Sequence, residues 1–166
     1  MKANLPDPDS APELFSELLP RRVFAYLIDI VLIGLAALLL ALCGIVLGFV
    51  TFGLAWLSMP LVLPLAIIGY YALTLGSSHR ATVGMSLMDI VLTPARGTPL
   101  DGWKVLLHPL LFWLTIWISW PVSLLFALFT PRQQMLHDLV LGTLMVRRSP
   151  MARHWAAYGT PDGQRV

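Results

Sequence analysis

The chain is poor in charge. Only 12% of its 166 residues are Asp, Glu, Lys or Arg, whereas soluble globular domains average about 25%. With 57% hydrophobic residues and a mean hydropathy of +0.76, too little polar surface remains to keep a chain of this size in water. The composition excludes an ordinary soluble domain and a disordered chain, and it indicates a membrane protein of one domain.

Sequence motifs for catalysis, metal binding or disulfide bonding are also scarce. Cys43 is the single cysteine, so the chain has no disulfide framework. The four histidines have no metal-ligand spacing, and no nucleophile elbow, phosphate loop or zinc-protease motif is present. We therefore expect neither an enzyme nor a cofactor. The basic residues are too few for nucleic-acid binding, which leaves the lipid bilayer, a second copy of the chain or another membrane protein as candidate partners.

The charges avoid two long apolar runs. Residues 23–75 contain one formal charge, Asp29, and residues 105–131 contain none. Because a bilayer-spanning helix needs about 20 apolar residues, the first run predicts two crossings, and the second predicts one crossing or two short half-crossings. We expect helices near 21–43 and 54–75, followed by a last apolar segment that is kinked or re-entrant near Pro121. The expected fold class is an all-α integral membrane protein, a small helical bundle.

The two ends of the chain differ from this apolar centre. Residues 1–20 are acidic and proline-rich and lack the basic start of a signal peptide, and residues 149–166 are basic and polar. We expect flexible tails at 1–20 and 149–166 around a transmembrane domain at 21–148. Residues 87–92 have β-like character, and the turn-rich stretch 94–99 follows them.

The basic residues favour an even number of crossings. With three crossings, the six Lys and Arg residues up to Lys104 would lie on one face and the five from Arg132 onwards on the other. The positive-inside rule predicts an excess on the cytoplasmic face, and an even number of crossings places all eleven there. This topology requires residues 105–131 to enter the membrane and return, with both termini in the cytoplasm.

Asp29 is the sharpest chemical feature. A carboxylate in the middle of a membrane helix costs about 3 kcal/mol on insertion scales, so it needs a compensating partner or a function. Arg22 lies two helical turns earlier on the same face, about 10 Å away along the axis. Asp29 is therefore either an ion or proton site or a buried polar anchor between helices. His137 and Asp138 form a second, weaker cluster, for which a helix cap or a surface ion pair is the simpler interpretation.

These residues resemble the RDD family of bacterial membrane proteins, which is named for one arginine and two aspartates. Arg22 and Asp29 in RVFAYLID match the start of the family's first helix, and Asp138 in LHDLVLGT matches its second aspartate. The resemblance covers about residues 20–148. It implies a bacterial inner-membrane protein in which Arg22, Asp29 and Asp138 form one polar cluster on the cytoplasmic side.

The resemblance implies a wider set of supporting residues. The family's loop turn corresponds here to Thr82-Val83-Gly84-Met85, where Met85 stands in place of the usual lysine and removes a cation. The supporting residues expected around the cluster are Thr82, Gly84, Arg132 and His137. The segments 87–92 and 143–146 are expected to meet as short cytoplasmic strands, which also requires both on one face.

Two functions fit these residues. In the first, the protein transports an ion or small solute, Asp29 exchanges a proton or cation, and Arg22 tunes its ionisation. In the second, the polar residues only fix the fold of a non-transporting accessory protein. That protein would bind another membrane protein through its apolar faces and through Gly44 and Gly48, which have the small-xxx-small spacing of helix contacts.

Overall fold

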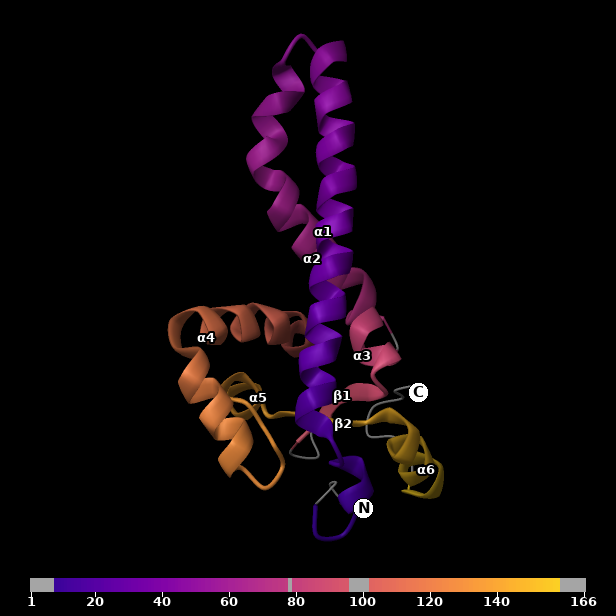
Figure 1. Ribbon diagram of the computed structural model, residues 1–166. Helices are drawn as coiled ribbons and strands as arrows, with labels where there is room; N and C mark the ends of the chain where they lie inside the picture. The colour runs from indigo at the N-terminus through magenta and orange to yellow at the C-terminus, as the bar shows by residue number, and fades with distance from the viewer. Residues whose placement is uncertain (1–7, 78, 96–101, 159–166) are drawn as a thin grey trace.

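The structure, a computed structural model, describes residues 8–77, 79–95 and 102–158 (Figure 1). The protein is mostly helical, with one small antiparallel sheet, which confirms the expected fold class. In chain order the elements are η1 (Pro12–Leu14), α1 (Leu18–Val50), η2 (Leu54–Leu61), α2 (Val62–Thr74), α3 (Val83–Leu87), β1 (Ile90–Pro94), α4 (Gly102–Phe129), α5 (Leu136–Leu141), β2 (Thr143–Arg147) and α6 (Arg148–Tyr158).

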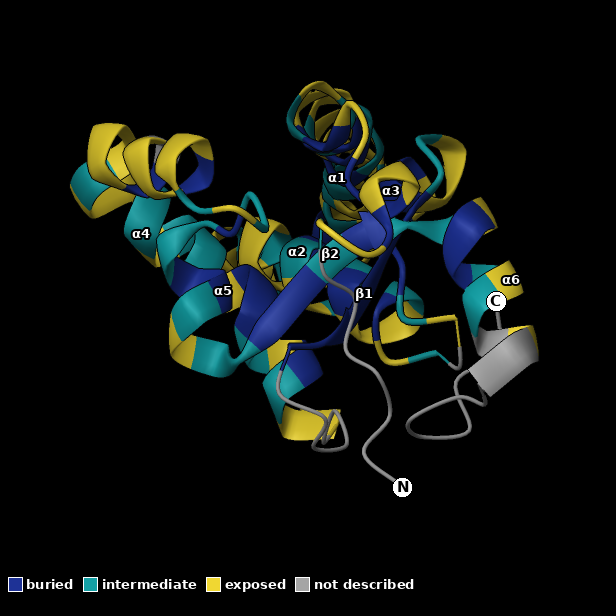
Figure 2. Ribbon diagram, turned by 90° about the horizontal axis from the view of Figure 1, so that it is seen from below, coloured by how far each residue is buried: buried dark blue, intermediate teal, exposed yellow. Residues whose placement is uncertain are grey.

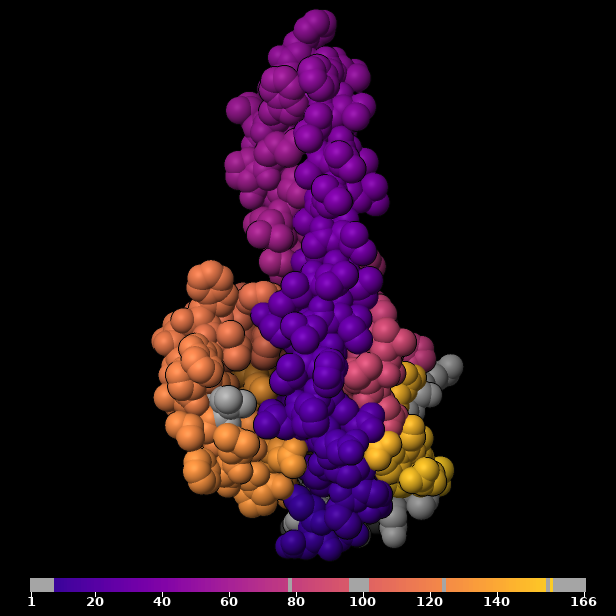
Figure 3. All heavy atoms as spheres, viewed as in Figure 1, coloured from indigo at the N-terminus to yellow at the C-terminus, as the bar shows by residue number. Residues whose placement is uncertain are grey.

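Within the described part of the chain, three segments are long and apolar enough to cross a membrane: Pro12–Val50, Leu54–Thr74 and Gly102–Ser123. Helix α1 has 33 residues and is therefore about 50 Å long, well beyond the expected stretch of 21–43. Together with η2 and α2 it forms a hairpin that projects from the rest of the protein (Figures 1 and 3). Most large apolar side chains on this hairpin are exposed, as lipid-facing residues would be.

The descending arm of the hairpin begins as a 3-10 helix and becomes α-helical at Val62. Pro60 lies inside this 3-10 segment, where it lacks the backbone N–H that a regular helix would use. Gly44 and Gly48 of α1 face this arm. A Cβ atom on Gly48 would lie 1.7 Å from the Trp56 ring nitrogen, and one on Gly44 would lie 2.7 Å from Met59. The glycine pair is therefore used within the chain, so it is not free to bind a partner as the accessory hypothesis had it.

The core lies at the base of the hairpin, around the sheet. Strands β1 and β2 pair antiparallel, with Ile90 opposite Arg147 and Pro94 opposite Thr143, so the two expected strand segments do meet. Every residue of β1 is buried, and Figure 2 shows the strands dark blue between the more exposed helices. An isolated pair of strands this short has little stability in water. In this protein, η1, α3 and α6 pack against the pair.

The described parts of the two expected tails contain ordered structure: residues 8–20 form turns, the 3-10 helix η1 and the start of α1, and residues 149–158 belong to α6. Leu14, Phe15 and Leu18 belong to the buried core, and Met151 of α6 is 2% exposed. Asp89, in the turn before β1, binds both the end of β2 and the start of α6. Its carboxylate accepts hydrogen bonds from Arg147 Nη2 of β2 at 3.0 Å and from the Ser149 backbone nitrogen of α6 at 2.9 Å. Residues 1–7 and 159–166, and most of the expected turn at 94–99, lie outside the described residues.

Helix α4 is broken. Ser119 has non-helical angles (φ −158°, ψ 58°), two residues before Pro121, whose missing N–H weakens the helix there. In Figure 1 its first half runs across the base of the hairpin and its second half turns back towards the sheet. The kink near Pro121 expected from the sequence is present.

We predict that Gly48→Ala destabilises the hairpin by about 1–3 kcal/mol, because the new Cβ collides with a ring that cannot simply swing aside. Thermal unfolding of the purified protein in detergent measures the effect. Gly34→Ala is the matched control, since no atom lies within 4 Å of a Cβ at that helical position. Equal stability of the two variants would contradict the close packing of α1 on η2.

Candidate functional site

The site begins with one buried stripe on α1. Leu18, Arg22, Ala25, Asp29 and Ile33 are buried at spacings of three or four residues, which places them on a single helix face. The rest of α1 is predominantly exposed and apolar. The two charged residues of the stripe therefore point towards the other elements at the base of the hairpin.

Arg22 forms a buried ion pair with Asp138. Its Nη1 donates to Asp138 Oδ2 at 2.8 Å, and the side chains are 5% and 0% exposed. The same carboxylate oxygen accepts from the Met135 backbone nitrogen at 3.1 Å, so Asp138 also caps the start of α5. Breaking a buried pair by removing one partner costs about 3–5 kcal/mol, so this contact holds α1 firmly to α5.

Two histidines surround the other oxygen of Asp138. His137 Nε2 lies 3.5 Å from Oδ1 and His108 Nδ1 lies 3.7 Å from it, while Thr143 Oγ1 donates to it at 3.3 Å. Burial alone would raise the pKa of Asp138, but the Arg22 guanidinium and the histidines lower it to about 2. Burial lowers the pKa of His137, and only part of this is offset by the carboxylate beside it. At neutral pH Asp138 is therefore a carboxylate, and the His137 imidazole beside it is neutral.

His108, His137 and Asp138 could hold a metal ion by distance alone, because their ligand atoms lie within 4.8 Å of one another. The spacing of the histidines in the sequence gave no sign of this, since the fold brings α4 and α5 together. However, Arg22 already neutralises Asp138, and a divalent cation would leave net positive charge in a buried site. The arrangement therefore fits a hydrogen-bonded polar cluster better than a metal centre.

Asp29 lies in a second polar centre. Its carboxylate accepts from Tyr70 Oη at 2.5 Å, Thr82 Oγ1 at 2.6 Å and the Gly84 backbone nitrogen at 2.8 Å. These donors come from α2, the start of α3 and its first turn. A Cβ atom on Gly84 would lie 2.2 Å from the Ala25 carbonyl oxygen, so glycine allows this close approach of α3 to α1. Among the described residues, Asp29 has no ion-pair partner.

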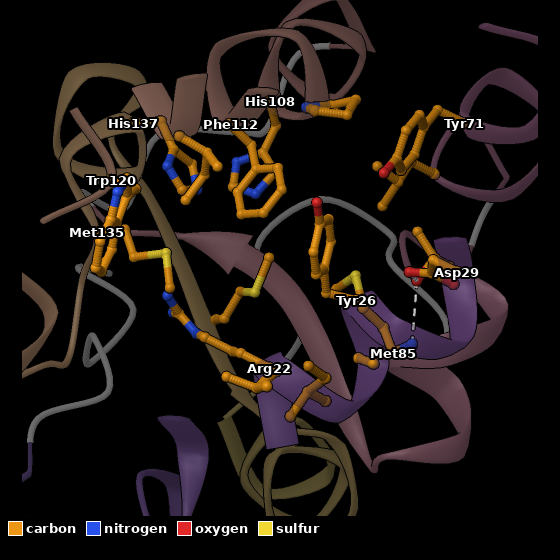
Figure 4. Close-up of a pocket in the computed structure, with 18 residues that line it drawn as sticks. Arg22, Tyr26, Asp29, Tyr71, Met85, His108, Phe112, Trp120, Met135 and His137 are labelled. Atoms are coloured by element: carbon orange, nitrogen blue, oxygen red, sulfur yellow. Dashed lines mark hydrogen bonds between the residues drawn. The ribbon is translucent and has the colours of Figure 1, made fainter. Parts of the chain in front are cut away.

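A cavity of about 210 Å³ joins the two centres. Figure 4 shows His108, His137 and Phe112 on one side of it, Tyr26, Met85 and Asp29 on another, and Arg22 reaching across towards Met135. Its wall is almost entirely apolar apart from these few polar groups. The lining residues are Arg22, Val23, Ala25, Tyr26, Asp29, Tyr71, Leu75, Thr82, Met85, Ile90, His108, Pro109, Phe112, Ile116, Trp120, Met135, His137 and Met145.

The structure divides the expected site residues into two groups. Arg22, His137 and Asp138 lie together, with His108 beside them, whereas Asp29 lies with Thr82 and Gly84. Both groups border the same cavity, but Arg22 bonds to Asp138 and not to Asp29. Arg132 is half-buried in the turn after α4 and does not line the cavity.

Sequence reasoning missed Tyr70 and Thr143. A tyrosine inside an apolar helix carries a hydroxyl that needs a partner, so Tyr70 could have been proposed as the partner of Asp29. Thr143 gave no such signal, since its contact with Asp138 depends on the turn at Gly142, where φ is +65°. His137 and Asp138 are adjacent in sequence, yet both side chains are buried in one cluster.

These features define a multi-pass membrane protein with three candidate spans and a buried Arg/Asp/His cluster at their base. The RDD family matches residues 18–142, which is well over half of the chain. The chain belongs to the RDD family. No curated protein and no solved structure matches it.

We predict that the protein loses stability as the pH falls from 7 to 5, and that His137→Gln reduces this loss. The pKa of His137 is lowered in the folded state, whereas an unfolded histidine titrates near 6.5. Below that pH the unfolded state binds more protons, which favours unfolding. Asp138 contributes nothing in this range, because its folded pKa of about 2 matters only below about pH 4.

Thermal unfolding in detergent at several pH values measures how steeply the unfolding temperature falls as the pH is lowered. His79→Gln, at an exposed position, is the control and should keep the slope of the native protein. An unchanged slope for His137→Gln would show that this imidazole does not lose its proton on folding.

Proposed function

We propose that the protein is a transporter of an ion or small solute in a bacterial inner membrane, and not an enzyme, with Asp29 as the group that exchanges a proton or cation. The observation that carries this proposal is a buried carboxylate on a candidate membrane span, held by neutral donors, at the wall of a cavity. Intramembrane acids are costly and are usually functional.

The donors around Asp29 suit a change of protonation. The hydroxyls of Tyr70 and Thr82 donate to the carboxylate, and a hydroxyl can rotate to accept a hydrogen bond from a protonated carboxyl group instead. Protonation of Asp29 would weaken the contacts that hold α2 and α3 to α1. Arg22 is bonded to Asp138, so we assign it to anchoring α1 and not to tuning Asp29. Since three candidate spans are few for a complete path, the transporting form would be a homo-oligomer.

We further propose that both termini lie in the cytoplasm. Strand β1 precedes α4 and β2 follows α5, and the two strands pair along their whole length. Both ends of the broken α4 segment therefore return to one sheet, which supports a re-entrant segment and an even number of crossings. All eleven Lys and Arg residues then lie on one face.

Cysteine labelling tests this orientation. In a background where Cys43 is replaced by Ala, Ala152→Cys in α6 should react with an impermeant maleimide only after the cells are opened. Phe52→Cys, at the fully exposed tip of the hairpin, should react from outside intact cells. Labelling of the α6 position from outside would overturn the proposed topology.

The transport proposal predicts that Asp29→Asn lowers flux to the level of empty liposomes while the protein still folds. Asparagine has nearly the same shape and still offers an oxygen to Gly84, but it cannot exchange a proton. The measurement is ion or proton flux into proteoliposomes containing a pH-sensitive dye. Asp89→Asn is the matched control, because it removes a carboxylate at the sheet and not at the cavity. Equal flux with and without Asp29 would remove it from the mechanism.

The accessory role is a second candidate, because the contacts of Asp29 and Asp138 can also be explained as contacts that only stabilise the fold. It predicts that Asp29→Asn fails to fold in detergent. It also predicts a membrane-protein partner that purifies with the chain in fixed stoichiometry. Normal folding with lost flux supports transport instead.

A further inference from the structure

The cavity has the size and lining of a site for an apolar ring. Aromatic rings of Tyr26, Phe112 and Trp120 border it, with the thioethers of Met135 and Met145. Its volume of about 210 Å³ exceeds the roughly 150 Å³ that is enough for benzene in an engineered protein cavity. A ring with a few substituents therefore fits.

Arg22 brings unused hydrogen-bond donors to this cavity. Of its guanidinium nitrogens, Nη1 donates to Asp138, but Nε and Nη2 are buried and have no partner. His108 Nε2 is likewise buried without a partner. Buried polar groups in proteins are nearly always hydrogen-bonded, and leaving one unsatisfied is costly. Unpaired nitrogens on two residues that border one cavity point to a ligand with acceptor oxygens.

Met135 is placed to act as the cover of these donors. Neither free nitrogen of Arg22 is open to the cavity's solvent, and Figure 4 shows the end of the Arg22 side chain beside Met135. A methionine side chain is unbranched and has three rotatable bonds, so it repacks at low cost. A head group can therefore reach the guanidinium by displacing this side chain.

The net charge around Arg22 indicates whether the acceptor group of the ligand is neutral or anionic. Asp138 already offsets the charge of Arg22, so an anionic head would place two anions on one cation in a buried site. Met85 also lines the cavity, and its neutral side chain supplies no second cation there. A carbonyl oxygen satisfies the free donors without adding charge.

From these contacts we propose that the cavity binds a membrane-soluble ring carbonyl compound, a quinone-like molecule whose carbonyl oxygen accepts from Arg22. Its apolar tail leaves between α1 and α4, where Val23 and Trp120 line the cavity and are 48% and 61% exposed. The inference rests on the proposed function only in treating this cavity as the solute site, because binding at equilibrium requires no transport.

Equilibrium binding of a decyl-substituted benzoquinone to the protein in lipid nanodiscs tests this proposal. We expect saturable binding of one molecule per chain, and binding of decylbenzene at least about tenfold weaker, since it lacks the acceptor. Arg22→Lys keeps the charge beside Asp138 but removes the fork of donors. It should weaken quinone binding by about tenfold or more.

A pair of identical substitutions on α4 separates the cavity from the lipid-facing surface. Ile116 lines the cavity, whereas Ile118 is 74% exposed. Ile116→Trp should abolish binding by filling the cavity, and Ile118→Trp should leave it unchanged. This pair carries the test even where Arg22→Lys fails to fold.

Four results would overturn the proposal. Absence of saturable quinone binding, or equal effects of the two tryptophan variants, would mean that the quinone only partitions into lipid. Equal affinity for decylbenzene would reduce the site to an apolar hole, and tighter binding of laurate would identify an anionic ligand instead. Quinone binding retained in Asp29→Asn, together with unchanged flux, would refute the transport role while leaving this inference intact.

Discussion

The ion pair between Arg22 and Asp138 is the contact on which the architecture depends. It joins the first helix to the short helix that precedes β2, across 116 positions of sequence. Two charges buried together are stable only when their geometry and remaining hydrogen bonds are good. The Met135 backbone nitrogen and Thr143 supply these hydrogen bonds for Asp138, and the two histidines lie within 3.7 Å of its Oδ1. Arg22 has only some of its hydrogen bonds, because its Nη1 is bonded to Asp138 while its Nε and Nη2 are not. Arg22 is therefore both an anchor for α1 and a candidate ligand-binding group.

Asp29 fastens the next layer in a different way. It holds α2 and α3 through three neutral donors and not through an ion pair with another described residue. Beyond Asp29 the hairpin has no further charged side chain, and its packing depends on glycines against Trp56 and Met59. Polar contacts are therefore gathered at one end of the protein, next to the sheet. The arm that projects from it depends on shape and on the apolar surroundings.

Local patterns in the sequence predicted much of this structure. The apolar runs gave the long helices, the β-like segment near 87–92 gave one strand, and Pro121 gave the break in α4, now found at Ser119. Pairings between distant segments were harder to predict. Arg22 and Asp29 share a helix face, which suggested a single cluster, but nothing local shows that Asp138 approaches Arg22 more closely than Asp29 does. Tyr70 and the packing of α4 against α5 likewise depend on tertiary contacts.

The two centres place different demands on whatever enters the cavity between them. Near Arg22 the charge is already balanced, and donors are in excess. Near Asp29 there is an acceptor that no cation pairs with among the described residues. A neutral molecule with a carbonyl at one end would satisfy the first centre without disturbing the ion pair. A small inorganic cation would satisfy only Asp29 and would meet apolar walls elsewhere. The lining of the cavity therefore suits a neutral lipophilic molecule better than a bare ion.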